Sequence, residues 1–171
     1  MTTGLVLPEK LAEQIEQILV DLHRRTGAEC TLLADISGQL ISTQGSIQGI
    51  DPVLVAALAA GDVAAMSELT RQIGEQDPHG SFLHEGENRC IYLFNVGGSL
   101  ILIVIFRSGT AIGLMRLFVR RAAERLYPLI TEFESALVQL RQIPVADFGA
   151  TLAEELDRVF EGVDSDQDPC S

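Results

Sequence analysis

Three histidines are the residues most able to hold a metal ion or to act as an acid or base. His23, His79 and His84 fall on three separate predicted elements, so no two share the spacing that places a ligand pair on one helix face. The sequence also lacks a Cys-x-x-Cys pair. We therefore predict no metal site and interpret His79 and His84 as exposed loop or edge residues.

Three cysteines bear on both chemistry and location. Cys30, Cys90 and Cys170 are odd in number and far apart, which suits neither a disulfide framework nor a zinc cluster. Cys30 and Cys90 lie in apolar stretches and are expected to be inert core residues. The N-terminal residues lack the basic flank and long apolar segment of a secretory signal. We expect a protein of the reducing cytoplasm.

Two glycine-containing loops could be considered as phosphate sites. The Gly-Gly-Ser at 97–99 joins two predicted strands, whereas nucleotide loops join a strand to a helix. The loop at 107–110 does lead into a helix, but it lacks the Lys and the glycine spacing of a phosphate loop. We interpret Thr110 as a helix N-cap and predict no nucleotide or other cofactor.

Catalysis by a nucleophile would need a base and an orienting group within hydrogen-bond reach of it. The sequence gives no such grouping. The carboxylates of Asp35, Asp51 and Glu85 have structural tasks available in turns and helix caps. We predict that the protein is not an enzyme.

Composition limits the remaining function classes. A chain of 171 residues that is 47% apolar is large enough for one domain with a core. Its net charge of −12 argues against nucleic acid and anionic membranes as partners. Residues 144–171 hold eight acidic residues and one arginine, which indicates a domain over 1–143 and an acidic extension over 144–171. The apolar stretch at 91–119 contains a glycine turn, so we expect no membrane insertion.

Hydrophobic periodicity predicts the order helix, two strands, helix, three strands, helix. The strand at 100–106 is apolar at every position, so helices should cover both faces of its sheet. Pro128 lies inside the third helix and should kink it or split it. The predicted elements are a helix from Pro8 to Gly27, strands at 30–35 and 40–43, a helix from Asp51 to about Ile73, strands at 81–85, 89–96 and 100–106, a helix from Thr110, and a tail helix at 148–163.

Six local segments carry a resemblance to a known family. They are 32–41 (LLADISGQLI), 58–69 (LAAGDVAAMSEL), 73–75 (IGE), 83–87 (LHEGE), 96–100 (VGGSL) and 112–116 (IGLMR). Together with the predicted order of elements, they resemble the roadblock/dynein light chain family. The resemblance implies an α/β sandwich of α-β-β-α-β-β-β-α order, with a five-stranded, mostly antiparallel sheet flanked by helices on both faces and a C-terminal helix added.

The resemblance also implies a homodimer in which the second helix and the middle strand of one chain meet those of another. An unpaired edge strand gives such pairing a physical motive. The alternative is that the small residues of the helix simply pack on their own sheet. The residues predicted for the dimer interface are Ala57, Ala60, Gly61, Ala64, Phe82 and His84.

Two further groups are predicted to bind partners. Arginines one turn apart on the third helix could dock an acidic partner or the acidic end of the chain, the alternative being a solvated helix face. The apolar stripe of the tail could bind a groove on another protein. The residues are Arg116, Arg120, Arg121, Arg125, Leu152, Leu156 and Phe160.

The leading hypothesis for function follows from the resemblance. Roadblock-type modules are dimeric platforms that regulate or scaffold Ras-like small GTPases, in some cases stimulating GTP hydrolysis. One alternative is a structural adaptor that binds through the tail helix. Another is a small-ligand sensor, which the aromatic content of 5% disfavours.

Overall fold

The computed structural model describes residues 7–75 and 80–141. Residues up to Glu134 form one compact unit, and the packing described below is that of this unit. All the helices and strands that the sequence predicts within these ranges are present. Their bounds are α1 Glu9–Thr26, β1 Cys30–Asp35, β2 Leu40–Gly45, α2 Pro52–Gln72, β3 Ser81–Glu85, β4 Arg89–Val96, β5 Leu100–Arg107 and α3 Ile112–Arg141.

The strands form a five-stranded sheet in the order β2-β1-β5-β4-β3, in which every neighbouring pair is antiparallel. Strand β5 is central, and each residue from Leu100 to Phe106 is at most 3% exposed. An all-apolar strand needs cover on both faces, and here it has that cover. The predicted fold class is confirmed.

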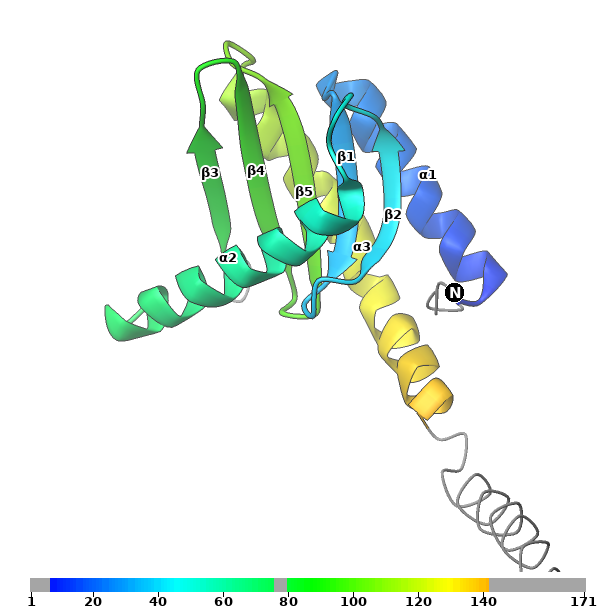
Figure 1. Cartoon of the computed structure of the whole chain (residues 1–171). Helices are drawn as coiled ribbons and strands as arrows, with labels where there is room; N and C mark the ends of the chain where they lie inside the picture. Colours follow the sequence, from blue (N-terminus) through cyan, green and yellow to red (C-terminus); the bar gives the residue numbers. More distant parts are fainter. Residues whose placement is uncertain (1–6, 76–79, 142–171) are drawn as a thin grey trace, which may run out of the picture. The chain divides into compact units, whose positions relative to one another are not determined.

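Two helices cover one face of the sheet and a single helix crosses the other (Figure 1). Side chains of a strand alternate between faces. Ile101, Ile103 and Ile105 therefore share a core with α2. The alternate residues Leu102 and Val104 point towards α1 and α3. The sheet thus carries two separate hydrophobic cores, one on each face.

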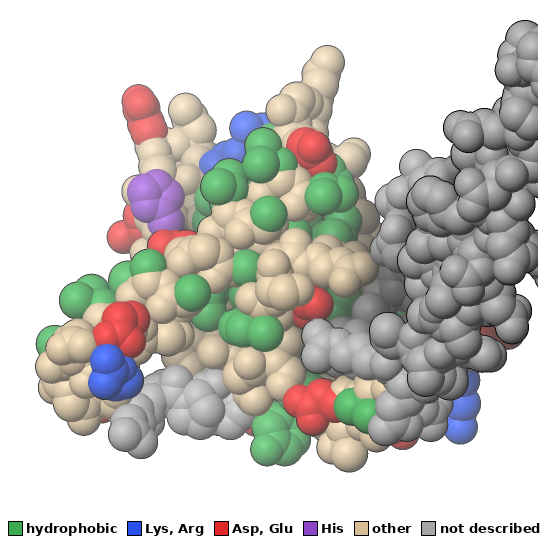
Figure 2. Space-filling model, turned by 60° about the horizontal axis from the view of Figure 1, so that its bottom comes forward, with side chains coloured by type: hydrophobic (Ala, Val, Ile, Leu, Met, Phe, Trp, Pro, Cys, Tyr) green, Lys and Arg blue, Asp and Glu red, His purple; other side chains and the backbone are tan. Residues whose placement is uncertain are grey.

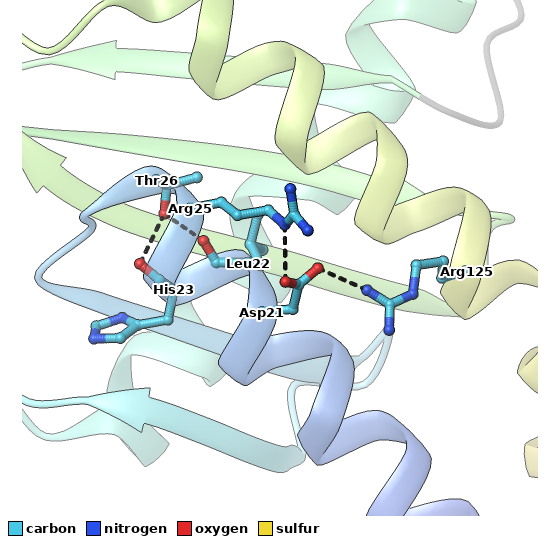
Figure 3. Close-up of polar contacts among 6 residues, drawn as sticks. All are labelled: Asp21, Leu22, His23, Arg25, Thr26 and Arg125. Atoms are coloured by element: carbon cyan, nitrogen blue, oxygen red, sulfur yellow. Dashed lines mark hydrogen bonds and ion pairs between the residues drawn. The ribbon is translucent and has the colours of Figure 1, made fainter.

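The α1–α3 face is tied together by a charged contact as well as by packing. Asp21 of α1 accepts hydrogen bonds from Arg25, at 2.8 Å, and from Arg125 of α3, at 2.9 Å (Figure 3). The Thr26 hydroxyl donates to the Leu22 carbonyl at 2.7 Å, one turn back in the same helix. Gly27 ends the helix in the left-handed conformation, with φ 62°, as its position predicted.

Short polar side chains set the turns that lead to α2. One Asp35 carboxylate oxygen accepts from the backbone N–H groups of Ser37 and Gln39, which fixes the β1–β2 turn. Asp51 caps α2 by accepting from the N–H of Val53 at 2.9 Å. The structural roles predicted for these two carboxylates are confirmed, and Glu85 lies exposed at the end of β3.

One prediction about α3 is wrong, and one of the two alternatives predicted for Pro128 is excluded. The Thr110 hydroxyl donates to the Arg107 carbonyl at 2.8 Å, so it stabilises the preceding turn instead of capping the helix. The helix does not split at Pro128 but continues as one element to Arg141. The domain boundary at 143 and the tail helix lie outside the described residues.

Candidate functional site

Helix α2 packs on the sheet through small side chains. Its buried residues are Ala56, Ala59, Ala60 and Val63, and all residues after Val63 are partly or fully exposed. Small side chains let the helix backbone approach its neighbours closely. A Cβ placed on Gly38 of the β1–β2 turn would lie 2.9 Å from the Ala57 Cα. The face of α2 that packs on the sheet therefore consists of small side chains, and its larger apolar side chains are exposed to solvent.

The outward face of α2 carries an apolar stripe. Its members recur every three or four residues, which places them on one side of the helix. Leu54, Leu58 and Leu69 are 56%, 65% and 55% exposed. Gly61 and Ala65 lie between them and are also exposed. Figure 2 shows hydrophobic side chains scattered along the surface of this helix. Three exposed leucines on one side of a helix make this face a candidate interaction surface.

Helix α2 is unusually apolar for a helix so little buried. Among the described helices, it alone is long and apolar enough to cross a membrane by length and composition, with a mean hydropathy of 1.5 and only 22% of that window buried. The stretch at 91–119, which a hydropathy scan of the sequence brings out, is instead β4, β5 and the start of α3. The exposed apolar surface therefore belongs to a helix docked on a sheet.

Beside this helix lies an uncovered sheet edge. Among the described residues, β3 pairs with β4 on one side only, and its other backbone edge has no strand beside it. The backbone of the opposite edge strand, β2, lies close to both α1 and α2, whereas that of β3 lies close to neither. A groove of about 570 Å³ separates α2 from β3. Phe82 and His84 of β3 line one wall, and Leu58 and Met66 of α2 line the other. The groove, the stripe and the free strand edge form one continuous surface, here named the α2–β3 surface.

The residues predicted for a dimer interface divide between this surface and the core. Ala57, Gly61 and Ala64 are exposed on α2, and Phe82 and His84 line the groove. Ala60 is only 6% exposed and belongs to the core beneath α2. Sequence reasoning missed the outward role of Leu54, Leu58 and Leu69. Their helical spacing was visible, but spacing does not say which of two apolar faces meets the sheet.

The four predicted arginines of α3 lie on two flanks of the helix. Arg116 and Arg120 line a groove on the opposite face of the sheet from α2. Arg121 and Arg125 line a cleft of about 220 Å³ between α3 and α1. The two arginines of each one-turn pair thus line the same depression, but the two pairs line different depressions.

The α1–α3 cleft is lined by a carboxylate of the chain itself, that of Asp21. Asp21 hydrogen bonds to Arg25 and Arg125 there, and the Arg25 hydrogen bond and the two nearby positive charges hold the pKa of Asp21 below its usual value. Arg125 is therefore committed to a contact within the fold. Arg116, Arg120 and Arg121 form no ion pair with any described residue.

The remaining candidate residues give no catalytic arrangement. Cys30 and Cys90 are buried and unpaired, and burial raises the pKa of the Cys30 thiol, which keeps it protonated and unreactive. Within residues 7–75 and 80–141, no three His, Cys, Asp or Glu side chains group as metal ligands. Leu152, Leu156, Phe160 and His79 lie outside the described residues. What this part of the chain offers is surface for binding other molecules.

Comparison with known proteins identifies the family. The model of the Roadblock/LC7 domain matches residues 14–106. The chain belongs to the Roadblock/LC7 domain family. This membership confirms the resemblance inferred from the six sequence segments.

Solved structures of Roadblock/LC7 proteins support the same conclusion. MglB of Myxococcus xanthus is 38% identical, with a TM-score of 0.67 over 77% of this chain and 96% of its own. The gliding protein MglB of Thermus thermophilus is 27% identical, with a TM-score of 0.67 over 77% of this chain and 99% of its own. A structure described as MglB with a tetrameric arrangement is 26% identical, with a TM-score of 0.67 over 77% of this chain and 98% of its own.

Proposed function

We propose that this Roadblock/LC7 protein is a cytoplasmic, non-catalytic homodimer that binds a Ras-like small GTPase and regulates or scaffolds it. The observation that carries the proposal is the α2–β3 surface, which combines a free strand edge with an exposed apolar helix. A second copy placed antiparallel would extend the sheet across β3 and cover the leucines of α2. Likeness to an MglB of tetrameric arrangement supports assembly in general.

The GTPase part of the proposal rests on family membership. Roadblock-type modules act as platforms for small GTPases, and two copies of this chain would present a wider and more rigid surface than one. The acidic net charge of −12 favours a protein partner over nucleic acid.

Gly61 offers a direct test of the dimer. It lies exposed on α2, and a Cβ built on it meets no atom within 4 Å, so an isolated chain tolerates a side chain there. Gly61→Arg would place a charge at the centre of the outward stripe. We expect light scattering to give a dimer for the full wild-type chain and a folded monomer for the variant, with unchanged circular dichroism.

Gly113→Arg is the matched control. Gly113 is an exposed glycine near the start of α3, and a Cβ built on it also meets no atom within 4 Å. This variant should remain dimeric. A monomeric wild-type chain, or a Gly61→Arg chain that stays dimeric, would contradict the proposed interface.

The partner is tested separately. Mixing the full chain with its cognate Ras-like GTPase, loaded with GTP or GDP, should give co-elution and a changed rate of GTP hydrolysis or nucleotide exchange. Co-elution without a rate change would indicate scaffolding. The absence of both effects with a confirmed dimer would reject the GTPase while leaving the dimer intact.

A further inference from the structure

A second groove opens on the opposite face of the sheet from α2, between α3 and the strands β3 and β4. It has a volume of about 660 Å³ and is here named the α3 groove. Strands β4 and β3 provide its floor and one margin, and α3 provides the other wall. Its lining residues are Ser81, Tyr92, Phe94, Val96, Arg116, Arg120, Ala123, Glu124 and Tyr127.

Two guanidinium groups border the α3 groove without a carboxylate partner. Arg116 and Arg120 are exposed, lie one helical turn apart and form no ion pair with any described residue. Lys10, Arg24 and Arg121 also form no ion pair with any described residue. What distinguishes Arg116 and Arg120 is that they line one groove together, one turn apart. Two guanidinium groups in the same depression can bind one external anionic segment.

The floor of the groove is apolar and aromatic. Phe94 and Tyr92 are 9% and 4% exposed, so they form a fixed base. Tyr127 of α3 is 55% exposed and lines the same groove, about two helical turns from Arg120. Aromatic rings and arginines together are the residue types enriched at the energetic centres of protein interfaces. The groove therefore offers apolar contact in its base, and its α3 wall carries two arginines against one carboxylate, that of Glu124.

We propose that the α3 groove is a docking site, separate from the α2–β3 surface, for an acidic linear segment of a partner protein that inserts one apolar side chain. Carboxylates of the segment pair with Arg116 and Arg120, while the apolar side chain contacts Phe94 and Tyr127.

Other ligand classes fit the groove less well. A free phosphate would use the arginines but leave the aromatic floor without a contact. A nucleic acid has bases to stack, but two arginines in a chain of net charge −12 cannot supply the many phosphate contacts that hold its backbone. A segment with both carboxylates and an apolar side chain uses both parts of the groove. The site needs neither dimerisation nor a GTPase, so it stands independently of the proposed function.

The test uses the full chain and a fluorescein-labelled synthetic peptide with a central Phe between blocks of Glu. Fluorescence anisotropy should show saturable binding that weakens as the salt concentration rises. Reversing both charges, with Arg116→Glu and Arg120→Glu, should weaken binding at least roughly tenfold. Arg116→Gln with Arg120→Gln should give a smaller loss in the same direction, and it removes the concern that added carboxylates disturb the fold.

A matched control reverses two charges elsewhere. Lys10 and Arg24 are exposed on α1 and line none of the three depressions described above. Lys10→Glu with Arg24→Glu should leave peptide binding unchanged within about twofold. The proposal is overturned if the control weakens binding as much as the groove variant does, if the wild-type chain does not bind the peptide, or if a peptide with Gln in place of Glu binds equally well.

Discussion

Helices α1 and α2 lie on opposite faces of the same sheet but use their apolar residues in opposite ways. α1 turns its large side chains inward, burying Leu11, Ile15, Ile18, Leu19 and Leu22. α2 buries three alanines and a valine and leaves three leucines in solvent. The large side chains of the first helix thus stabilise its own domain, whereas those of the second remain exposed and form part of the interface proposed above. The difference follows from composition and its distribution: α1 confines its apolar residues to one stripe, whereas α2 carries them on more than one face, so some remain exposed when one face packs on the sheet.

The sharpest test of this comparison removes a leucine from each helix. Leu19 is fully buried in α1, and Leu58 is 65% exposed on α2. In a Gly61→Arg background that keeps the chain monomeric, Leu19→Ala should lower the free energy of unfolding by about 2–5 kcal/mol. Leu58→Ala should change it by less than about 0.5 kcal/mol. Urea denaturation followed by circular dichroism measures both.

A similar loss of stability for the two leucine variants would show that Leu58 is buried in the monomer, and the comparison would fail. Without the Gly61→Arg change, Leu58→Ala should instead weaken self-association, which light scattering over a dilution series detects.

A smaller effect concerns the close approach of α2 to the sheet. Gly38 and Gly49 both have positive φ, at 90° and 80°. A Cβ on Gly38 would lie 2.9 Å from the backbone of α2, whereas one on Gly49 would meet no atom within 4 Å. Both alanine variants carry the backbone strain, so the contact with α2 accounts for their difference. We expect Gly38→Ala to be less stable than Gly49→Ala by about 1–3 kcal/mol in the same denaturation assay.

The smallest effect separates the charged contacts of the two faces. Asp21 joins α1 to α3, whereas the Arg71–Glu68 pair lies within α2. The pKa of Asp21 is lower in the folded than in the unfolded chain because Arg25 and Arg125 stabilise its carboxylate. Its contribution to stability is therefore fully present above the unfolded pKa and is lost as pH falls through the lowered folded value. Asp21→Asn should lower the melting temperature at neutral pH and flatten its decline in acid.

Glu68→Gln provides the control for that experiment. The Arg71 hydrogen bond also lowers the pKa of Glu68, but the pair joins residues of one exposed helix. Its removal should shift the melting temperature less than Asp21→Asn does at neutral pH. Equal shifts for the two variants would mean that the α1–α3 contact adds nothing beyond a local helix pair.

Much of the fold followed from short-range signals. Pro52 after Asp51, Gly27 after an amphipathic run, and the paired glycines after β4 each act within a few residues, so their physical meaning can be read locally. The uninterrupted apolar run of β5 also predicted its central, doubly covered place in the sheet. The prediction that Thr110 caps α3 failed because a hydroxyl near a helix start can equally well hydrogen bond within the preceding turn.

The site was less predictable because it depends on which side of an element faces inward. Ala60 and Gly61 are neighbours in the sequence, yet one enters the core and the other faces solvent. Ala60 lies on the side of α2 that packs against Gly38 of the β1–β2 turn, a contact between segments distant in the sequence. The separation of Arg116 from Arg121 likewise required the positions of α1 and β4 around α3.

The strand order also governs when the domain can fold during its synthesis. Strand β1 pairs with β5, so that Cys30 lies opposite Ile105 and Asp35 opposite Leu100. The meander from β3 to β5 joins strands that are adjacent in sequence, whereas β1 must wait for a partner made much later. During synthesis on a ribosome, α1 and the β1–β2 hairpin would therefore leave the exit tunnel before β3, β4 and β5 of the same sheet. We expect the nascent chain not to fold into a stable sheet until β5 has emerged and paired with β1.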